Sequence, residues 1–434
     1  MMNIKLVLLA CILFHFQGIQ AQQKPAESQQ QAISIQGATA HTGTGKVIEN
    51  SLIVFSNGKI DYVGKQDKDQ LKGKVIDAGG KHIYPGFIAP NATLGLVEID
   101  AVEATRDEDE IGKFLPHIRS LIAYNTESKV VESMRPNGVL MGQITPRGGR
   151  ISGTSSIVQF DAWHWEGAVV KADDAVHLNW PTQYRRTGYG FGGGKGWKLN
   201  KKYEEEVDRL EDYFKRAKAY AVQTPEDEDL AFEAMSGLFS GEKKLYVHTD
   251  AAKCLLDMIA FKKEFDLPEM VVVGGYRANQ VADELKNNDI PVLVQRVHSL
   301  PRYQNEDFDH PYKLPAQLAK KGVLVGLEGS GRMERMNSRN IPFYAGTTGG
   351  YGLTKEQALQ LITSNTAKIL GVYGDYGSLE KGKSATLFIS EGDALDMQGN
   401  KLTHAFIDGR AISLESHQTQ LYDKFKEKYA KQGE

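Results

Sequence analysis

The residues with the chemistry of a metal site lie in or just after apolar runs. His248 closes the run KLYVH, His298 follows VLVQRV, Glu328 follows VLVGL, and His177 lies in DDAVHLNW. Imidazoles together with one carboxylate are a ligand set that suits zinc. Three alternatives stay open: His248 could be a buried histidine kept for its hydrogen bonds, His298 could be a substrate contact or purely structural, and Glu328 could point outward.

Repeated strand and helix signals must position these residues. Nearly continuous apolar runs such as EMVVVGG and IPVLVQRV alternate with helix-like stretches such as RANQVADELKNND. Runs of this kind are typical of parallel strands buried on both faces. We therefore expect an α/β fold, a (β/α)₈ TIM-like barrel over 85–376, with its chemistry at the carboxyl ends of the strands.

Both ends of the chain have a different texture of short alternating strands. The stretch SNGK between two apolar runs predicts a tight hairpin turn at Asn57 and Gly58, because Asn-Gly accommodates positive φ angles. Gly-rich turns again separate short strands over 377–412. These patterns predict one small composite β domain built from both chain ends.

The first residues predict export. A Lys, a short apolar run and a small residue indicate a signal peptide over 1–21, followed by a polar, disordered leader over 22–32. We expect a periplasmic or secreted protein. Lipid attachment at Cys11 is an alternative that the very short apolar run before it disfavours. The mature chain would keep only Cys254, which excludes an internal disulfide.

Charge and hydropathy exclude some partners. A net charge of −3 gives no basic excess for binding phosphates, so we expect no nucleic-acid partner. Beyond the leader, no apolar run is long enough to predict a membrane span. Arg147 and Arg150, in TPRGGRISG, could shape an anionic pocket, although a tight turn between strands explains the same residues.

Framework segments at both ends resemble a known family. GATAHTGTGKVIENSLIVFSNGKIDYVG, YPGFI and SNTAKILGVYGDYGSLEKGKSATLFISEGDALD are similar to the metal-dependent amidohydrolases of the imidazolonepropionase-like type. The resemblance implies a β-sandwich formed by 33–84 and 377–413 around the barrel of 85–376, and a C-terminal helix follows over 414–434.

The resemblance also implies a metal site that this chain has partly lost. In active members PGFI precedes Asp-x-His-x-His, and the matching residues here are Ala89, Asn91 and Thr93. Both side chains at the two histidine positions would lie on one face of the strand. An amide and a hydroxyl are weak ligands for zinc-like metals. We therefore interpret Asn91 and Thr93 as lost ligand positions.

Of the other metal-ligand positions that the resemblance implies, some keep a histidine and others do not. His177 and His248 align with metal-ligand positions, and Gly274 stands where another histidine is expected. The position of the catalytic aspartate is matched by Ser330, or by Glu328 if the register shifts. A rebuilt site of His177, His248 and Glu328 is one hypothesis, and its cofactor would be one zinc or similar divalent metal, or none.

The expected activity follows from the resemblance alone. It implies a hydrolase that acts on carbon–nitrogen bonds other than ordinary peptide bonds, with a small amide or cyclic amide as substrate. The alternative is a catalytically inactive homologue that serves as a binding module or as the partner subunit of an active amidohydrolase. A homo-oligomer is also compatible with the sequence.

Overall fold

The computed structural model describes residues 24–187, 196–223, 227–303, 305–331 and 333–431. The predicted signal peptide and Cys11 lie outside these residues, as does the centre of the glycine-rich stretch before Trp197. Among the described residues, no helix combines the length and the apolarity needed to cross a membrane.

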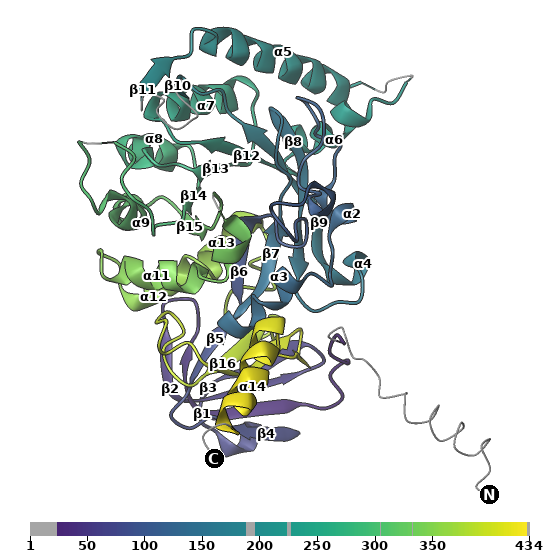
Figure 1. Ribbon diagram of the computed structural model, residues 1–434, viewed down its shortest axis with the longest axis vertical. Helices are drawn as coiled ribbons and strands as arrows, with labels where there is room; N and C mark the ends of the chain where they lie inside the picture. The colour runs from purple at the N-terminus through teal and green to yellow at the C-terminus, as the bar shows by residue number, and fades with distance from the viewer. Residues whose placement is uncertain (1–23, 188–195, 224–226, 304, 332, 432–434) are drawn as a thin grey trace, which may run out of the picture.

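An eight-stranded sheet at one end of the molecule, called here the end sheet, pairs strands from both ends of the chain (Figure 1). Its order is β18 (Arg410–Ala411), β17 (Leu402–Ile407), β16 (Leu387–Ser390), β5 (His82–Pro85), β1 (Ile33–His41), β2 (Val47–Ser56) and β3 (Lys59–Lys65), with β4 (Lys74–Asp77) beside β1. The predicted hairpin turn between β2 and β3 is confirmed by positive φ angles at Asn57 and Gly58. The described strands pair as one sheet, so a separate sandwich domain and its boundaries stay a prediction.

A second eight-stranded sheet, the barrel sheet, curves into a nearly closed barrel. Its order is β6 (Phe87–Ala92), β7 (Val139–Ile144), β8 (Ile151–Gln159), β9 (Val169–Asn179), β12 (Lys244–Thr249), β13 (Met270–Gly274), β14 (Val292–Gln295) and β15 (Val325–Glu328). Strands β6, β7 and β8 are buried along their whole length, which explains why small and apolar residues dominate them, although Asn91 and Gln143 are buried there too. β15 packs near β6, and this contact brings the first and last strands together.

The barrel departs from regular β/α alternation in its first half. β8 is antiparallel to both β7 and β9, whereas the other neighbouring pairs of the sheet are parallel. Only residues 145–150 connect β7 to β8, and a short connection of that kind can join antiparallel but not parallel strands. The fold is therefore a TIM-like α/β barrel with an antiparallel section, and the predicted regular (β/α)₈ order holds only in part.

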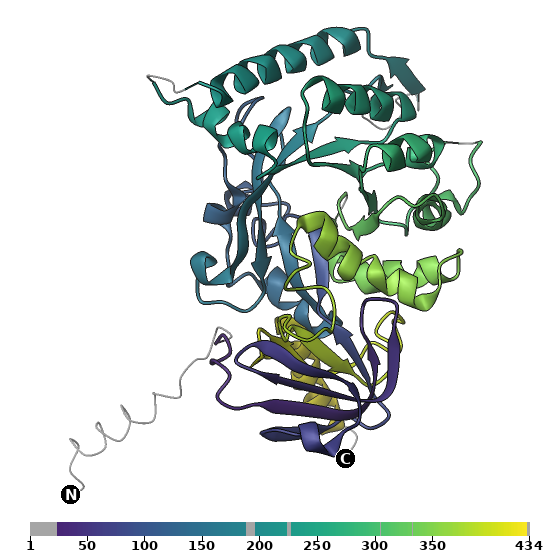
Figure 2. The same cartoon turned by 180° about the vertical axis from the view of Figure 1, so that it is seen from behind.

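Helices cover the outside of the barrel. The longer ones are α5 (Tyr203–Ala221), α6 (Leu230–Ser240), α7 (Ala252–Glu264), α9 (His310–Lys320) and α11 (Ile341–Gly349), and the shorter ones are α2 (Ser120–Ala123), α3 (Lys129–Glu132), α4 (Trp165–Ala168), α8 (Ala282–Asn287), α10 (Glu334–Ser338), α12 (Lys355–Gln360) and α13 (Ser364–Leu370). α12 begins with a capping box at Thr354. Figures 1 and 2 both show α11 and α12 on the side of the barrel that faces the end sheet.

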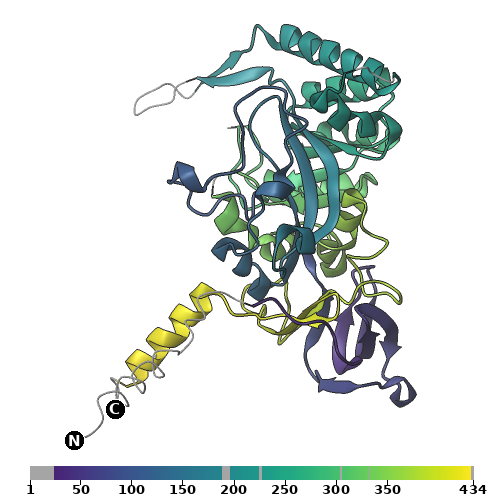
Figure 3. The same cartoon turned by 90° about the vertical axis from the view of Figure 1, so that its right-hand side faces the viewer.

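Two further elements lie outside the main layers. The hairpin of β10 (Tyr184–Thr187) and β11 (Gly196–Leu199) stands next to the barrel mouth. The C-terminal helix α14 (His417–Ala430) buries none of its residues and projects away from the body of the molecule (Figure 3). It begins at a Ser416 capping box, inside the range predicted for a C-terminal helix.

Candidate functional site

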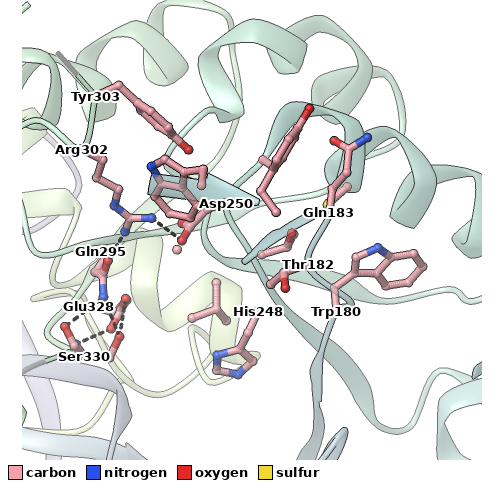
Figure 4. A pocket seen from close by; sticks show the side chains of 17 residues that line it. Trp180, Thr182, Gln183, His248, Asp250, Gln295, Arg302, Tyr303, Glu328 and Ser330 are labelled. Carbon is pink, nitrogen blue, oxygen red and sulfur yellow. Dashed lines mark hydrogen bonds and ion pairs between the residues drawn. The ribbon is translucent and has the colours of Figure 1, made fainter. Parts of the chain in front are cut away.

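A cavity of about 310 Å³, called here the mouth cavity, opens at the carboxyl ends of five barrel strands, β9 and β12–β15. This is the end of the barrel at which the sequence places the chemistry. Figure 4 shows Glu328 and Ser330 on one side, Trp180, Thr182 and Gln183 on the other, and His248 between the two groups. Three of the predicted site residues are therefore brought together in one cavity.

Glu328 is the buried carboxyl group of this cavity. It ends β15 with no exposed surface and accepts hydrogen bonds from the Ser330 backbone N–H at 2.5 Å and the Ser330 hydroxyl at 2.9 Å. Burial is the main reason that its pKa is raised to about 7, while the bonds from Ser330 act in the opposite direction. A carboxyl group with this pKa can accept and return a proton near neutral pH.

A polar chain connects Ser330 to the outer rim of the cavity. The Gln295 amide donates to the Ser330 carbonyl at 3.2 Å, and its oxygen accepts from Arg302 at 2.6 Å. Arg302 also pairs with Asp250, which follows directly after β12 (Figure 4). The sequence reasoning missed these three residues, although Asp250 lies two positions after His248 and directly after the strand, where a site residue is expected.

Aromatic rings form the outer wall. Trp197 of β11 stacks on Tyr303 with ring centroids 5.8 Å apart, and both line the mouth cavity. Trp180, at the end of β9, is buried on the same side of the cavity. Large rings with a few convergent polar groups are typical of a site for a small organic molecule.

His177 and His248 form a direct pair. His177 Nδ1 lies 2.9 Å from His248 Nε2, so one ring donates a hydrogen bond to the other. Burial lowers the pKa of His248 to about 3 and holds that of His177 well below its usual value, and the nearby positive charge of Arg147 adds to both shifts. Both rings are therefore neutral near pH 7.

Asn91 and Thr93, the two positions predicted to have lost a ligand, belong to a hydrogen-bonded network. The Asn91 side-chain oxygen accepts from Arg147 at 3.0 Å, and its amide nitrogen donates to Glu328 at 3.3 Å. Thr93 donates to Glu334 through both its backbone N–H, at 2.8 Å, and its hydroxyl, at 3.1 Å. The polar groups of both residues are thus already engaged with protein partners.

Other predicted positions lie elsewhere. His298 is exposed, and its Nε2 lies 2.7 Å from the Thr347 hydroxyl oxygen; it lines a different cavity, next to α11 and α12. Gly274 borders the mouth cavity with a φ of 92°, and a Cβ there would lie 2.8 Å from the Asp250 carboxylate. A histidine at this position would not fit without movement of Asp250.

These donors do not fit the divalent metal that the family resemblance implies. The hydrogen bond between His177 and His248 occupies one nitrogen of each ring, and the Asn91 oxygen is held by a guanidinium. Within the described ranges, no cluster of three or more His, Cys, Asp or Glu side chains has the arrangement of a metal site. Zinc usually takes at least three protein ligands of these types.

Comparisons with known proteins support the predicted resemblance. Residues 323–412 match the model of the Amidohydrolase family. An amidohydrolase from Thermotoga maritima MSB8 has a similar structure, with 24% identity, a TM-score of 0.74, and coverage of 88% of this chain and 99% of that one. A comparison with curated protein sequences found no match.

More distant structures share the fold. A prolidase complexed with N-methylphosphonate-L-proline is 14% identical, with a TM-score of 0.55 over 88% of this chain and 99% of that chain. Molinate hydrolase is also 14% identical, with a TM-score of 0.53 over 89% and 96% of the two chains. The resemblance to amidohydrolases that the sequence predicts is thereby confirmed.

Proposed function

We propose that this protein, an amidohydrolase by fold, hydrolyses a carbon–nitrogen bond of a small amide or cyclic amide bound in the mouth cavity. The observation that carries the proposal is Glu328, a fully buried carboxyl group with a pKa of about 7 at the end of a barrel strand. Such a group is suited to general acid–base work at neutral pH.

The residues present can perform the proton transfers of such a reaction. Ionised Glu328 takes a proton from water while the hydroxide adds to the amide carbon. The same proton then passes to the leaving nitrogen as the carbon–nitrogen bond breaks, which returns Glu328 to its ionised form. The hydrogen bonds from Ser330 and Asn91 hold the carboxylate in place during both steps.

The cavity favours a small substrate with one polar end. Its volume of about 310 Å³ is near the lower limit for ligand pockets in proteins. Trp197 and Tyr303 offer apolar surface, while Arg302, a third of whose side chain is exposed, offers a cation. The prolidase and molinate hydrolase neighbours are, by their names, hydrolases of small molecules, which supports the same class.

Two further parts of the proposal concern the cell and the assembly. Export follows from the predicted signal peptide, and fractionation with N-terminal sequencing of the mature chain tests it. Pairing with an active homologue or with a second copy is tested by the mass of the purified protein in solution.

The main experiment compares wild-type protein with Glu328→Gln on a panel of X-Pro dipeptides, N-acyl amino acids and cyclic amides. We expect one class to be hydrolysed and Glu328→Gln to lower kcat by about 10²–10⁴-fold, because the proton acceptor is lost. The wild-type rate should rise with pH through about 7, as Glu328 ionises. The exposed Glu166, far from the cavity, gives the matched control Glu166→Gln, which should retain activity.

Two results would contradict the proposal. Equal activity of wild-type protein and Glu328→Gln would remove Glu328 from the reaction. Binding of panel members without any turnover would instead support the inactive homologue, with the mouth cavity as a binding site only.

A further inference from the structure

Arg147 lies where the first and last strands of the barrel meet. It follows β7 closely, and its guanidinium reaches the end of β6, where it donates to the Asn91 side-chain oxygen at 3.0 Å and to the Asn91 carbonyl at 2.8 Å. The same guanidinium pairs with Glu334 at 2.9 Å, at the start of α10. It also donates to the carbonyls of Thr145 at 3.3 Å and Pro146 at 3.4 Å, so five oxygen atoms surround one fixed cation.

The partners of this cation are buried. Asn91 is 1% exposed and Glu334 is 7% exposed, and Arg147 itself is only about a quarter exposed. A buried carboxylate such as Glu334 needs a positive partner, because an unpaired charge in this environment is costly. Arg147 supplies that partner from within the chain.

The charge of Arg147 also reaches the other predicted ligand positions. It contributes to the low pKa values of His177 and His248, and it opposes the upward shift of the pKa of Glu328. The guanidinium therefore favours neutral imidazoles and an ionised carboxyl group.

Arg147 also sets the orientation of Asn91. Since the guanidinium has donors only, it must face the amide oxygen, and the amide nitrogen is then directed toward Glu328. Arg147 acts on Glu328 through Asn91, so it is a positioning residue rather than a catalytic one.

We infer that the guanidinium of Arg147 supplies the positive charge that a divalent metal supplies in the family. The folded chain is then stable without such a metal. The guanidinium donates a hydrogen bond to the side-chain oxygen of Asn91, the first position predicted to have lost a ligand, and balances the negative charge of Glu334. A metal ion in this network would find the Asn91 oxygen and one nitrogen of each imidazole already hydrogen-bonded, and a fixed positive charge would repel it. The inference concerns the electrostatics of the site and holds whether or not the chain hydrolyses a substrate.

The first test uses the wild-type mature chain, purified without a metal-affinity column. We expect far less than one zinc per chain and an unfolding temperature that neither EDTA nor added ZnCl₂ changes. About one zinc per chain, removed by EDTA with a clear fall in the unfolding temperature, would overturn the inference. This assay needs no variant and no substrate, so its failure is distinct from failure of the proposed hydrolysis.

The second test asks whether Arg147 acts through its charge. Arg147→Met keeps much of the side-chain length but removes the cation, and Arg147→Lys keeps the cation. We expect Arg147→Met to lower the unfolding temperature by several degrees more than Arg147→Lys, because Glu334 is left unpaired. Adding Glu334→Gln should recover part of the loss in the Met background and cause a loss in the wild-type background.

If the changes in unfolding temperature of Arg147→Met and Glu334→Gln simply add in the double variant, the two side chains do not interact, and this contradicts a role for the charge of Arg147. If Arg147→Met does not fold, the cycle is run with Arg147→Lys and Glu334→Gln. An unfolding temperature unaffected by Glu334→Gln in the wild-type background would then overturn the pairing on which the inference rests.

Discussion

At the scale of single residues, the His177–His248 pair shows how burial fixes a protonation state. Both rings are neutral in the folded protein near pH 7, and each has one nitrogen engaged with the other. In the unfolded chain, each imidazole would instead titrate near its ordinary value of 6.5. The proton affinity of the pair therefore differs between the folded and unfolded states.

This difference predicts an acid-sensitive fold. As the pH falls below 6.5, the two imidazoles of the unfolded chain bind protons. The folded pair stays unprotonated until the pH approaches about 3, where His248 titrates. The contribution to stability is thus present above pH 6.5 and is lost as the pH falls, at up to about 1.4 kcal/mol per pH unit for each ring. The free energy of unfolding in urea, measured for the wild-type protein from roughly pH 7.5 to 5, gives this dependence of stability on pH.

A variant isolates the effect. His248→Gln should show a shallower loss of unfolding free energy in acid than the wild type, while the exposed residue His117 gives the control His117→Gln with an unchanged slope. Equal slopes for wild type and His248→Gln would show that the pair is not the origin of the acid sensitivity.

At the scale of secondary-structure elements, the β10–β11 hairpin contributes one wall of the mouth cavity. Trp197 stacks on Tyr303 but keeps 50% of its surface exposed, which leaves an aromatic face available to a ligand. We expect Trp197→Ala to weaken binding of the best panel compound about tenfold, since a lost aromatic contact costs on the order of 1 kcal/mol. Isothermal titration calorimetry measures this change.

The stability of the same variant separates binding from folding. Because Trp197 lies on an exposed hairpin, the free energy of unfolding should change by less than about 0.5 kcal/mol. Trp163, which is 64% exposed and lines a different cavity, provides Trp163→Ala as a control with unchanged affinity. Equal affinities of Trp197→Ala and the wild type would exclude the hairpin from the binding site.

Elements with local signals could be predicted from the sequence. The Asn57–Gly58 turn depends on two adjacent residues, and His248 lies one residue before the end of a parallel strand, as its apolar run indicates. The antiparallel direction of β8 was not predicted, although a tight turn over 145–150 indicates it, because so short a connection cannot join parallel strands.

Contacts that depend on barrel closure were also beyond the sequence. The side chains of Arg147 and Glu334 are 187 positions apart and meet only because β6 and β15 come together. The family resemblance predicts Asn91 and Thr93 as lost ligand positions, but no nearby residue indicates that Asn91 would bond to a guanidinium and Thr93 to a carboxylate.

At the scale of the whole molecule, Asp161 joins the barrel to the end sheet. Its carboxylate accepts from Arg135 at 3.2 Å, from Arg410 of β18 at 2.7 Å, and from the Ala26 backbone N–H at 2.9 Å. The Asp161 side chain is 1% exposed and that of Arg135 is 6% exposed. Three segments that are far apart in the sequence thus share one buried negative charge.

Removal of this charge should destabilise the whole chain. Asp161→Asn leaves two guanidinium groups without their shared carboxylate, and loss of one partner of a buried ion pair typically costs about 3–5 kcal/mol. Asp173→Asn is the matched control, because Asp173 pairs with Arg119 at 2.8 Å with both side chains partly exposed, where a pair contributes at most about 1 kcal/mol. Urea unfolding followed by tryptophan fluorescence and circular dichroism compares the two variants. If Asp161 joins the barrel and the end sheet into one cooperative unit, the fluorescence and circular dichroism transitions should coincide in the wild type and separate in Asp161→Asn. Equal losses of unfolding free energy in Asp161→Asn and Asp173→Asn would show instead that this junction contributes no more than a surface ion pair.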